Sequence, residues 1–487
     1  MNKFKPVMFV GTASDVGKSV LATAFCRVLK QEGYQPAPFK AQNMSLNSYV
    51  TPEGLELGRA QAVQAEACNI PSHTDMNPVL LKPNSEKSSQ IVLNGKPVGN
   101  QSAREYFLGN NKEKLFEEAK AAFQRLHEKY SPIVMEGAGS ISELNLKKRD
   151  ISNMRMAMAA GADVYLVADI DKGGVFASVY GSIQLLNPEE RKHIKGIIIN
   201  KFRGDASLFE EGKNLIKDLT GIPVVGLLPY FKDIFIEEED SVSLKKKFSK
   251  AVEKRLNIGV VLLPHISNFT DFSRLERDER VHLFYSHDKE ELAASDILIL
   301  PGTKSTIADL HFLRRKGIAE VILHAHKAGK KVIGICGGYQ MMGSWIEDPY
   351  QVESEMVRYP GLGLLPVNTI LEKEKQTVER TFLYRDLDTP CKGYEVHMGK
   401  TIGSGNPLIY FQDGTTDGCW LSDQCWGTYL HGILDNAVVL DDLLREKGNR
   451  SEDLLNWADF KQQQYDKLAD HLRRHLDLDY MINLLNA

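Results

Sequence analysis

The chain has 487 residues, of which 43% are hydrophobic and 25% are charged, a composition typical of a soluble globular protein. One hydrophobic core rarely serves more than about 300 residues, so the length predicts two or three domains. The formal net charge of -4 gives no electrostatic reason to expect a nucleic-acid partner. No apolar run approaches the roughly 18 residues of a membrane-spanning helix, so we expect no membrane partner either.

The cysteines indicate a reducing compartment. None of them forms a C-x-x-C pair or a dense framework, which predicts a cytoplasmic protein without structural zinc. The six are Cys26, Cys68, Cys336, Cys391, Cys419 and Cys425. The first apolar stretch, residues 6–10, ends at Gly11 and is predicted to be a strand rather than a signal peptide.

The first half of the chain alternates apolar runs with helical stretches. Residues 112–126 have helical spacing and lie between two such runs. The runs that are typical of buried parallel strands lie at residues 7–10, 133–135, 164–167, 196–199 and 224–227. This alternation predicts a doubly wound α/β sheet.

A phosphate-binding loop, G-T-A-S-D-V-G-K-S at residues 11–19, follows the first strand and precedes a helical run. Backbone N–H groups of such a loop hold phosphate oxygens, so we expect Lys18 to reach the β- and γ-phosphates of ATP and the Ser19 hydroxyl to ligate Mg²⁺. Gly11 and Gly17 are separated by five residues, one more than usual. The predicted ATP-binding residues here are Gly11, Thr12, Ser14, Asp15, Val16, Gly17, Lys18 and Ser19.

A charged stretch at residues 233–255 separates this series from a second one. Four acidic residues at 237–240 are followed by three lysines at 245–247, which predicts a solvated linker, with a site for a charged partner as the alternative. The second α/β series has apolar strands at residues 258–263, 297–300 and 331–335, and later strand-like segments at 393–397 and 419–428.

The tail, residues 454–485, is predicted to be helical. Tyr465, Leu468, Leu472 and Leu476 fall on one face, and we expect this face to pack on the second domain. Acidic residues offset the arginines of the tail, which disfavours membrane attachment.

Cys336 follows the strand at residues 331–335 and precedes two glycines and a helical start. Glycines permit a sharp strand-to-helix turn, and a helix N-terminus stabilises a thiolate, so this position suits a nucleophile. The alternative is a small buried core residue. Together with the phosphate loop, the thiol predicts an enzyme that activates one group with ATP and delivers a second group from cysteine.

The phosphate loop resembles that of dethiobiotin synthetase and its relatives, the ATP-dependent amidases of cobalamin synthesis. The turn Glu136-Gly137-Ala138-Gly139 resembles a turn of that group, which implies that Glu136 ligates Mg²⁺ beside Ser19; a helix-capping role is the alternative. Asn200 opens a segment similar to the one that meets the adenine base, and residues 167–177 resemble a stretch near the phosphates. Motifs at residues 40–45, 58–65 and 77–83 complete the pattern. The acceptor-binding candidates are Lys40, Asn43, Ser45, Arg59 and Gln61.

Cys336 is similar to the nucleophile of class I glutamine amidotransferases, and residues 428–432 (T-Y-L-H-G) resemble the segment that supplies the base, which implies His431. The oxyanion and glutamine-binding candidates are Gly302, Thr303, Gly337 and Gln340. That class usually carries His-x-Glu, but Ile433 stands at the glutamate position, so what orients His431 stays open. His397, in a stretch interpreted as an interface or substrate element, is a rival base.

From near residue 5 to about residue 435, the order of these motifs resembles the cobyric acid synthase family. The resemblance implies two doubly wound, mainly parallel-sheet α/β domains with a helical C-terminal tail. The expected boundaries are a P-loop domain at residues 1–232, a linker at 233–255, a class I glutamine amidotransferase-like domain at 256–450 and a helical extension at 451–487.

The same resemblance implies an ATP- and glutamine-dependent amidation of the b, d, e and g carboxylates of adenosylcobyrinic acid a,c-diamide, through an acyl phosphate and ammonia released at Cys336. The implied partners are small molecules: the corrinoid, L-glutamine and ATP, with Mg²⁺; the oligomeric state stays open. One alternative is cobyrinic acid a,c-diamide synthase. Another is a P-loop regulatory ATPase with an inert second domain, although partitioning ATPases carry a lysine where this chain has Ala13.

Overall fold

The computed structural model describes residues 3–85, 88–102, 111–239, 244, 247–253, 255–445 and 456–486. The chain forms two compact units. Unit 1 comprises Met1–Met44, Leu57–Glu237 and Ala458–Ala487, and unit 2 comprises Ser45–Glu56 and Glu238–Trp457. Unit 1 therefore includes the C-terminal helices, and unit 2 includes a short segment from the N-terminal part of the chain. The predicted domain boundaries include neither of these two crossings.

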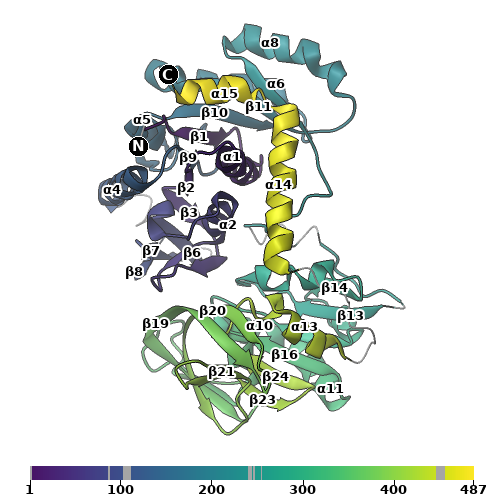
Figure 1. Cartoon of the computed structure of the whole chain (residues 1–487). Helices are drawn as coiled ribbons and strands as arrows, with labels where there is room; N and C mark the ends of the chain where they lie inside the picture. Colours follow the sequence, from purple (N-terminus) through teal and green to yellow (C-terminus); the bar gives the residue numbers. More distant parts are fainter. Residues whose placement is uncertain are drawn as a thin grey trace. The chain divides into compact units, whose positions relative to one another are not determined.

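The core of unit 1 is a six-stranded parallel sheet in the order β12-β11-β10-β1-β9-β2. Figure 1 labels β11, β10, β1, β9 and β2 of this sheet. Its strands are β1 (Val7–Gly11), β2 (Ala37–Phe39), β9 (Ile133–Glu136), β10 (Asp163–Asp169), β11 (Ile194–Phe202) and β12 (Val224–Pro229). The five apolar runs predicted as strands of the first domain all lie in this sheet. Strands that are buried on both faces carry near-continuous apolar sequence, which is why these runs are recognisable.

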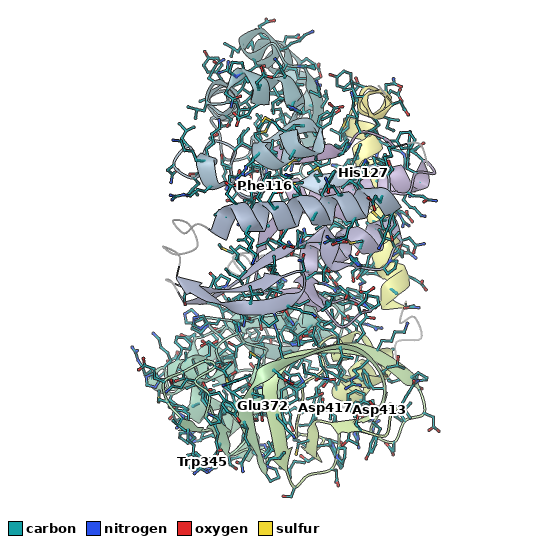
Figure 2. All side chains as sticks on the ribbon, turned by 90° about the vertical axis from the view of Figure 1, so that its left-hand side faces the viewer. Phe116, His127, Trp345, Glu372, Asp413 and Asp417 are labelled. Atoms are coloured by element: carbon teal, nitrogen blue, oxygen red, sulfur yellow. The ribbon has the colours of Figure 1, made fainter. Side chains whose placement is uncertain are left out.

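Helices cover both faces of this sheet. They are α1 (Lys18–Gln31), α2 (Arg59–Cys68), α4 (Asn111–Lys129), α5 (Met154–Ala160), α6 (Val175–Gln184), α7 (Pro188–His193), α8 (Glu210–Thr220), α14 (Trp457–His475) and α15 (Leu478–Leu485). Val7 and Phe9 pack with α1, α14 and α15, whereas Met8 and Val10 pack with α4, α5 and α6, because successive strand residues point to opposite faces. Figure 2 shows α4 with Phe116 and His127 labelled. A second sheet of unit 1 has the order β3-β6-β7-β8: β3 (Gln42–Met44), β6 (Val79–Ser85), β7 (Ser88–Leu93) and β8 (Lys96–Ser102).

The prediction that the tail packs on the second domain is wrong. Tyr465, Leu468, Leu472 and Leu476 are buried in unit 1 with side chains of α1 and β1, and α15 lies beside β10 and β11 in Figure 1. Gly226 of β12 makes room for this docking, because a Cβ there would lie 2.0 Å from Leu476 Cδ2. The tail forms two helices, α14 and α15, as its predicted helical character requires.

The predicted charged linker falls partly outside the described residues. In its described part, Glu237 is buried and pairs with Arg59 at 2.5 Å, and Ile234 and Ile236 pack against the unit 1 core. This portion is therefore a packed part of unit 1 rather than a solvated stretch.

Unit 2 is built on a second six-stranded sheet in the order β14-β13-β15-β16-β24-β23, parallel except for β23. Its strands are β13 (Leu256–Val261), β14 (Val281–Ser286), β15 (Ile297–Leu300), β16 (Lys331–Ile335), β23 (Cys419–Ser422) and β24 (Cys425–Thr428). Its helices are α9 (Lys289–Ala293), α10 (Thr306–Arg315), α11 (Ile318–Lys327), α12 (Gly337–Met342) and α13 (Ala437–Leu444). Two doubly wound α/β units with a helical tail confirm the predicted fold class. No helix in the described part of the chain has the length and apolarity needed to cross a bilayer.

A further, mainly antiparallel sheet completes unit 2. Its long hairpin pairs β19 with β20, and Figure 2 labels Trp345, Glu372, Asp413 and Asp417 in this region. Its strands are β17 (Trp345–Glu347), β18 (Arg358–Pro360), β19 (Val367–Tyr384), β20 (Pro390–Gly403), β21 (Ile409–Phe411) and β22 (Thr416–Asp417).

Candidate active sites

The phosphate loop connects β1 to α1 through a turn that only certain residues can adopt. Asp15 and Gly17 have φ values of 57° and 102°. A Cβ at Gly17 would lie 2.2 Å from Asn200 Nδ2, so glycine is required there. Asn200 donates from Nδ2 to the carbonyl of Val16 at 2.8 Å. The structure therefore brings Asn200, near the end of β11, onto the predicted loop.

The remaining loop residues are held by backbone contacts. Thr12 donates its N–H to the carbonyl of Val167 at 3.0 Å, and its carbonyl accepts from the Ser140 hydroxyl at 2.8 Å. Ser14 is exposed. Lys18 is buried, and its Nζ donates to the carbonyl oxygens of Ala13 at 3.0 Å and Gly139 at 2.8 Å. The ammonium thus lies between the phosphate loop and the E-G-A-G turn.

Glu136 is the centre of a buried polar cluster. Its Oε1 accepts from the Ser19 hydroxyl at 2.7 Å and from Lys40 Nζ at 2.9 Å, and its Oε2 accepts from Gln64 Nε2 at 2.9 Å. Burial favours the neutral acid, but the charge of Lys40 and these hydrogen bonds outweigh it and lower the pKa of Glu136. The carboxylate is therefore ionised at neutral pH.

The pair of Ser19 and Glu136 fits Mg²⁺ by its donor chemistry. Mg²⁺ prefers oxygen ligands and keeps waters and substrate phosphates in its shell, so one hydroxyl and one carboxylate are a suitable protein contribution. Among the described residues, no group of three or more His, Cys, Asp and Glu side chains could hold a metal by itself. A metal here would depend on nucleotide phosphates for the rest of its shell.

The acceptor-binding candidates divide into two groups. Lys40 contacts Glu136, and Asn43 donates to Gln61 Oε1 at 3.0 Å, so three of them lie in or next to the Glu136 cluster. Gln61 Nε2 is buried without a partner in the described structure. Arg59, in contrast, pairs with Glu237, and Ser45 belongs to unit 2, where it donates to the carbonyl of Glu239 at 3.1 Å.

A cavity of about 770 Å³ in unit 1 opens beyond the ends of β11 and β12. Its walls include Phe202, Arg203, Tyr230, Lys467, His471 and Arg474. The Arg203 guanidinium lies 4.0 Å from the centre of the Tyr230 ring. The cavity follows Asn200 directly along the chain, and its basic side chains suit an anionic or aromatic ligand.

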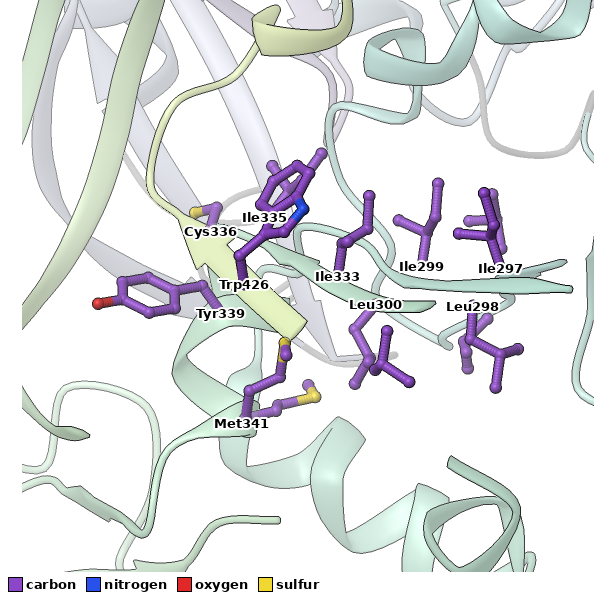
Figure 3. Close-up of a cluster of buried hydrophobic side chains, with 14 of the residues drawn as sticks. Ile297, Leu298, Ile299, Leu300, Ile333, Ile335, Cys336, Tyr339, Met341 and Trp426 are labelled. Atoms are coloured by element: carbon purple, nitrogen blue, oxygen red, sulfur yellow. The ribbon is translucent and has the colours of Figure 1, made fainter. Parts of the chain in front are cut away.

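Cys336 lies at the end of β16, directly after the apolar side chains that form the core of the sheet (Figure 3). Its φ of 51° and ψ of -109° are unusual for a residue with a side chain. A Cβ at Gly338 would lie 2.0 Å from the carbonyl oxygen of Leu300. The turn is therefore pressed against β15, which holds the thiol in its strained position as a nucleophile elbow does.

His431, the predicted base, is the histidine that the fold brings to Cys336. It is almost completely buried, and its side chain interacts with the Cys336 thiol. Its Nδ1 is 2.7 Å from Asp271 Oδ2, and the Gly432 N–H donates to Asp271 Oδ1 at 2.9 Å. Burial alone would lower the pKa of His431, but the charge of Asp271 and the interaction with Cys336 raise it to about 10.

Asp271 is the functional residue that sequence reasoning missed. It lies in the 3-10 turn η5 (Phe269–Phe272), 160 residues before His431. No motif marks it, because its role depends on the fold bringing η5 to the loop after β24. Ile433 stands where the usual His-x-Glu pair has its glutamate, and the Asp271 carboxylate contacts His431 instead. Cys336, His431 and Asp271 therefore form a Cys-His-Asp arrangement.

His397 is placed less favourably for the role of base. Its Nδ1 is 2.7 Å from the carbonyl of Gly399, its Nε2 is 3.3 Å from Glu395 Oε1, and its ring stacks on Tyr429 at 3.7 Å. Both ring nitrogens are engaged, so the geometry favours His431.

The other glutaminase candidates surround the thiol. A Cβ at Gly302 would lie 3.0 Å from His431 Cε1, and a Cβ at Gly337 would lie 2.6 Å from Thr303 Cγ2. Both glycines therefore lie where the loop after β15 comes close to the Cys336 turn and to His431. Thr303 donates to Asp309 Oδ2 at 2.6 Å. Gln340 accepts from the Thr306 hydroxyl at 2.9 Å and donates to the Tyr429 hydroxyl at 3.3 Å, which fixes its amide.

Replacing Asp271 by asparagine should keep an acceptor for His431 but remove the negative charge. Without this charge the pKa of His431 falls, so the imidazolium that protonates the departing amide nitrogen is lost at lower pH. We expect kcat/KM for glutamine to fall about 10²–10⁴-fold. The alkaline limb of its pH profile should also move to lower pH, whereas ammonia-dependent turnover stays unchanged. An alkaline limb at the parental pH would contradict this role of Asp271.

Comparison with known proteins covers the whole chain. Residues 7–244 match the model of the CobQ/CobB/MinD/ParA nucleotide binding domain, and residues 257–439 match that of the CobB/CobQ-like glutamine amidotransferase domain. The chain is 60% identical to a cobyric acid synthase of Parabacteroides distasonis over 98% of both chains. It is 58% identical to one of Bacteroides fragilis, over 100% of this chain and 99% of the relative, and 57% identical to one of Phocaeicola vulgatus, over 99% and 98%. With such similarity along its full length, the chain belongs to the cobyric acid synthase family, enzymes of the carbon–nitrogen ligase and amidotransferase type.

Proposed function

We propose that this enzyme uses ATP and glutamine to amidate the b, d, e and g carboxylates of adenosylcobyrinic acid a,c-diamide, giving adenosylcobyric acid, ADP and phosphate. One observation carries the proposal: a chain of this family combines a phosphate loop beside a buried Lys40–Glu136 pair with a Cys336–His431–Asp271 arrangement. The first supports activation of a carboxylate, and the second supports release of ammonia. The six cysteines are all free thiols, which suits a reducing, cytoplasmic compartment.

Glutamine hydrolysis would occur in unit 2. The Cys336 thiol gives its proton to His431, the thiolate Sγ attacks the side-chain amide carbon, and the tetrahedral oxyanion is held by backbone N–H groups near Thr303 and Gly337. The C–N bond then breaks as His431 gives a proton to the nitrogen, which leaves as ammonia. Water hydrolyses the resulting thioester to glutamate and regenerates the thiol. The fixed amide of Gln340 is suited to orient the substrate.

Carboxylate activation would occur in unit 1. A carboxylate resists attack by ammonia because its leaving group would be oxide, so the γ-phosphoryl group of ATP is first transferred to it. Lys18 is positioned to neutralise charge on that group, and Asn200 and the neighbouring cavity are suited to the adenosine part. Mg²⁺, held by Ser19 and Glu136, would supply further neutralisation of the phosphates. Ammonia then displaces phosphate from the acyl phosphate and forms the amide.

The acceptor contact is assigned to Lys40, Asn43 and Gln61. Their ammonium and amide groups can form hydrogen bonds with the carboxylate and amide side chains of the corrinoid acceptor. A buried amide without a partner is rare in a folded protein, so Gln61 Nε2 supports a ligand at this place. Arg59 is paired with Glu237 rather than with the Glu136 cluster, and Ser45 lies in unit 2, so both are weaker candidates.

High-resolution mass spectrometry of the corrinoid product tests the reaction. Each replacement of a carboxyl OH by NH₂ lowers the mass by about one unit, so we expect the a,c-diamide to gain four amides with one ATP and one glutamine consumed per amide. Cobyrinic acid serves as the parallel substrate. Two amides formed on cobyrinic acid itself would identify a cobyrinic acid a,c-diamide synthase. ATP hydrolysis without any corrinoid amidation would favour the regulatory ATPase.

A further inference from the structure

Ser45–Glu56 is a segment of unit 2 whose flanking residues on both sides belong to unit 1. It contains β4 (Ser48–Val50) and a turn closed by a hydrogen bond from the Thr51 N–H to the carbonyl of Leu55 at 2.8 Å. In the sequence it follows Lys40 and Asn43, and it leads through β5 (Glu56–Gly58) into the helix that carries Gln61. The segment is thus continuous with the acceptor residues of unit 1 and packed within the unit that carries Cys336.

One side of the segment holds the turn that carries Asp271. The Ser48 N–H donates to Asn268 Oδ1 at 3.0 Å, and the Phe269 N–H donates to Asn47 Oδ1 at 3.3 Å. The Asp271 N–H in turn donates to the carbonyl of Asn268 at 3.0 Å. Asn47, Ser48, Asn268 and Asp271 are all at most 2% exposed, so water does not compete for these bonds. The position of the Asp271 carboxylate therefore depends on the segment.

The other side of the segment contacts the residue that stacks on His431. The Tyr394 hydroxyl donates to the carbonyl of Ser48 at 3.3 Å, and the Tyr49 ring lies 4.9 Å from the Tyr394 ring. The Tyr394 ring stacks on the His431 imidazole at 5.3 Å, and the two residues exchange backbone hydrogen bonds at 3.1 Å and 2.9 Å. The segment thus reaches His431 from two directions, through Asp271 and through Tyr394.

We propose that Ser45–Glu56 positions the glutaminase residues, with Asn47 and Asn268 as positioning residues. Neither asparagine touches the reacting atoms; both act through Asp271. The proposal rests on the proposed function, because it assumes that Cys336 hydrolyses glutamine.

Two pairs of variants separate positioning from folding. Asn268 has a φ of 52°, so Asn268→Gly removes the side-chain acceptor without straining the backbone, whereas Asn268→Asp keeps an oxygen in place. Asn47→Ala and Asn47→Asp form the second pair. Glu53→Gln, at an exposed position of the same segment, is the matched control.

The measurements are kcat and KM for glutamine, amidation with high free ammonia, and glutamate release with and without ATP plus the corrinoid. We expect Asn268→Gly and Asn47→Ala to lower kcat with glutamine about 10–100-fold, with KM and ammonia-dependent amidation within about twofold of the parent. The aspartate variants should recover most of the rate, and Glu53→Gln should match the parent.

Two outcomes would overturn the positioning role. The first is parental glutamine use in both Asn268→Gly and Asn47→Ala. The second is an equal loss with glutamine and with ammonia, which would show that the segment only supports the fold. If the parent releases glutamate but amidates no corrinoid, the proposed function fails by itself. The positioning role is then decided by glutamate release, which must still fall in Asn268→Gly and recover in Asn268→Asp.

Discussion

Replacing Cys336 by serine is expected to abolish glutamine-dependent amidation and to spare amidation supported by high free ammonia. The thiol lies at the elbow after β16 and in the proposed mechanism provides the atom that bonds to the glutamine carbon, whereas the residues predicted to bind ATP belong to unit 1. The loss should exceed the roughly 10²–10⁴-fold that general-base help contributes, because the nucleophile itself is removed. Both nitrogen donors are compared in one preparation, so a general loss of folded protein would be visible as a loss with ammonia.

The two histidines near the thiol provide the comparison for this experiment. His431→Ala should resemble Cys336→Ser with a smaller loss, whereas His397→Ala should not selectively reduce glutamine use, since both nitrogens of His397 are engaged by Gly399 and Glu395. Normal glutamine turnover in Cys336→Ser would refute the nucleophile. A selective loss in His397→Ala but not in His431→Ala would move the base to His397.

Replacing Lys18 by alanine is expected to remove activity with either nitrogen donor. The buried ammonium lies between the carbonyls of Ala13 and Gly139, where we propose that it faces the negative charge of the transferring phosphoryl group. Removal of one preorganised donor to such charge typically costs 10²–10³-fold in kcat, or about 3–4 kcal/mol of barrier. In the proposed mechanism acyl phosphate formation precedes attack by ammonia, so we expect that excess ammonia does not rescue this variant.

Lys30→Ala, in the last turn of the same helix, is the matched control and should amidate at the parental rate. Basal glutamate release should persist in Lys18→Ala, because the glutaminase residues are intact. Ammonia-dependent turnover at the parental rate in Lys18→Ala would show that the loop binds something other than the reacting ATP.

Features determined by local sequence could be predicted. The parallel strands carry continuous apolar runs because both faces of each sheet are covered, and the phosphate loop and the Cys336 elbow each lie within one strand-turn-helix unit. His431 was reached only through resemblance, since nothing in its immediate neighbourhood distinguishes it from a structural histidine.

Features that depend on surfaces meeting in space could not be predicted. An amphipathic pattern indicates that Leu468 and Leu472 are buried, but it does not indicate which surface buries them. In the structure this surface belongs to unit 1, where Gly226 makes room for the tail, and not to unit 2. Asp271 could not be identified for the same reason, because its carboxylate contacts His431 and Gly432, which lie 160 and 161 residues further along the chain. The exchange of residues 45–56 likewise depends on buried asparagines whose partners lie more than 200 residues along the chain.

The docking of the tail on unit 1 has a consequence for the order in which the protein matures. During synthesis the strands of the nucleotide-binding sheet emerge first, but the side chains of α14 and α15 that cover α1 and β1 emerge after all of unit 2. Unit 2 ends at Trp457, so it can fold before α14 and α15 have emerged, while unit 1 still exposes the apolar surface that these helices cover. On the ribosome the N-terminal unit is therefore the last to be finished, which reverses the usual N-to-C order of domain folding.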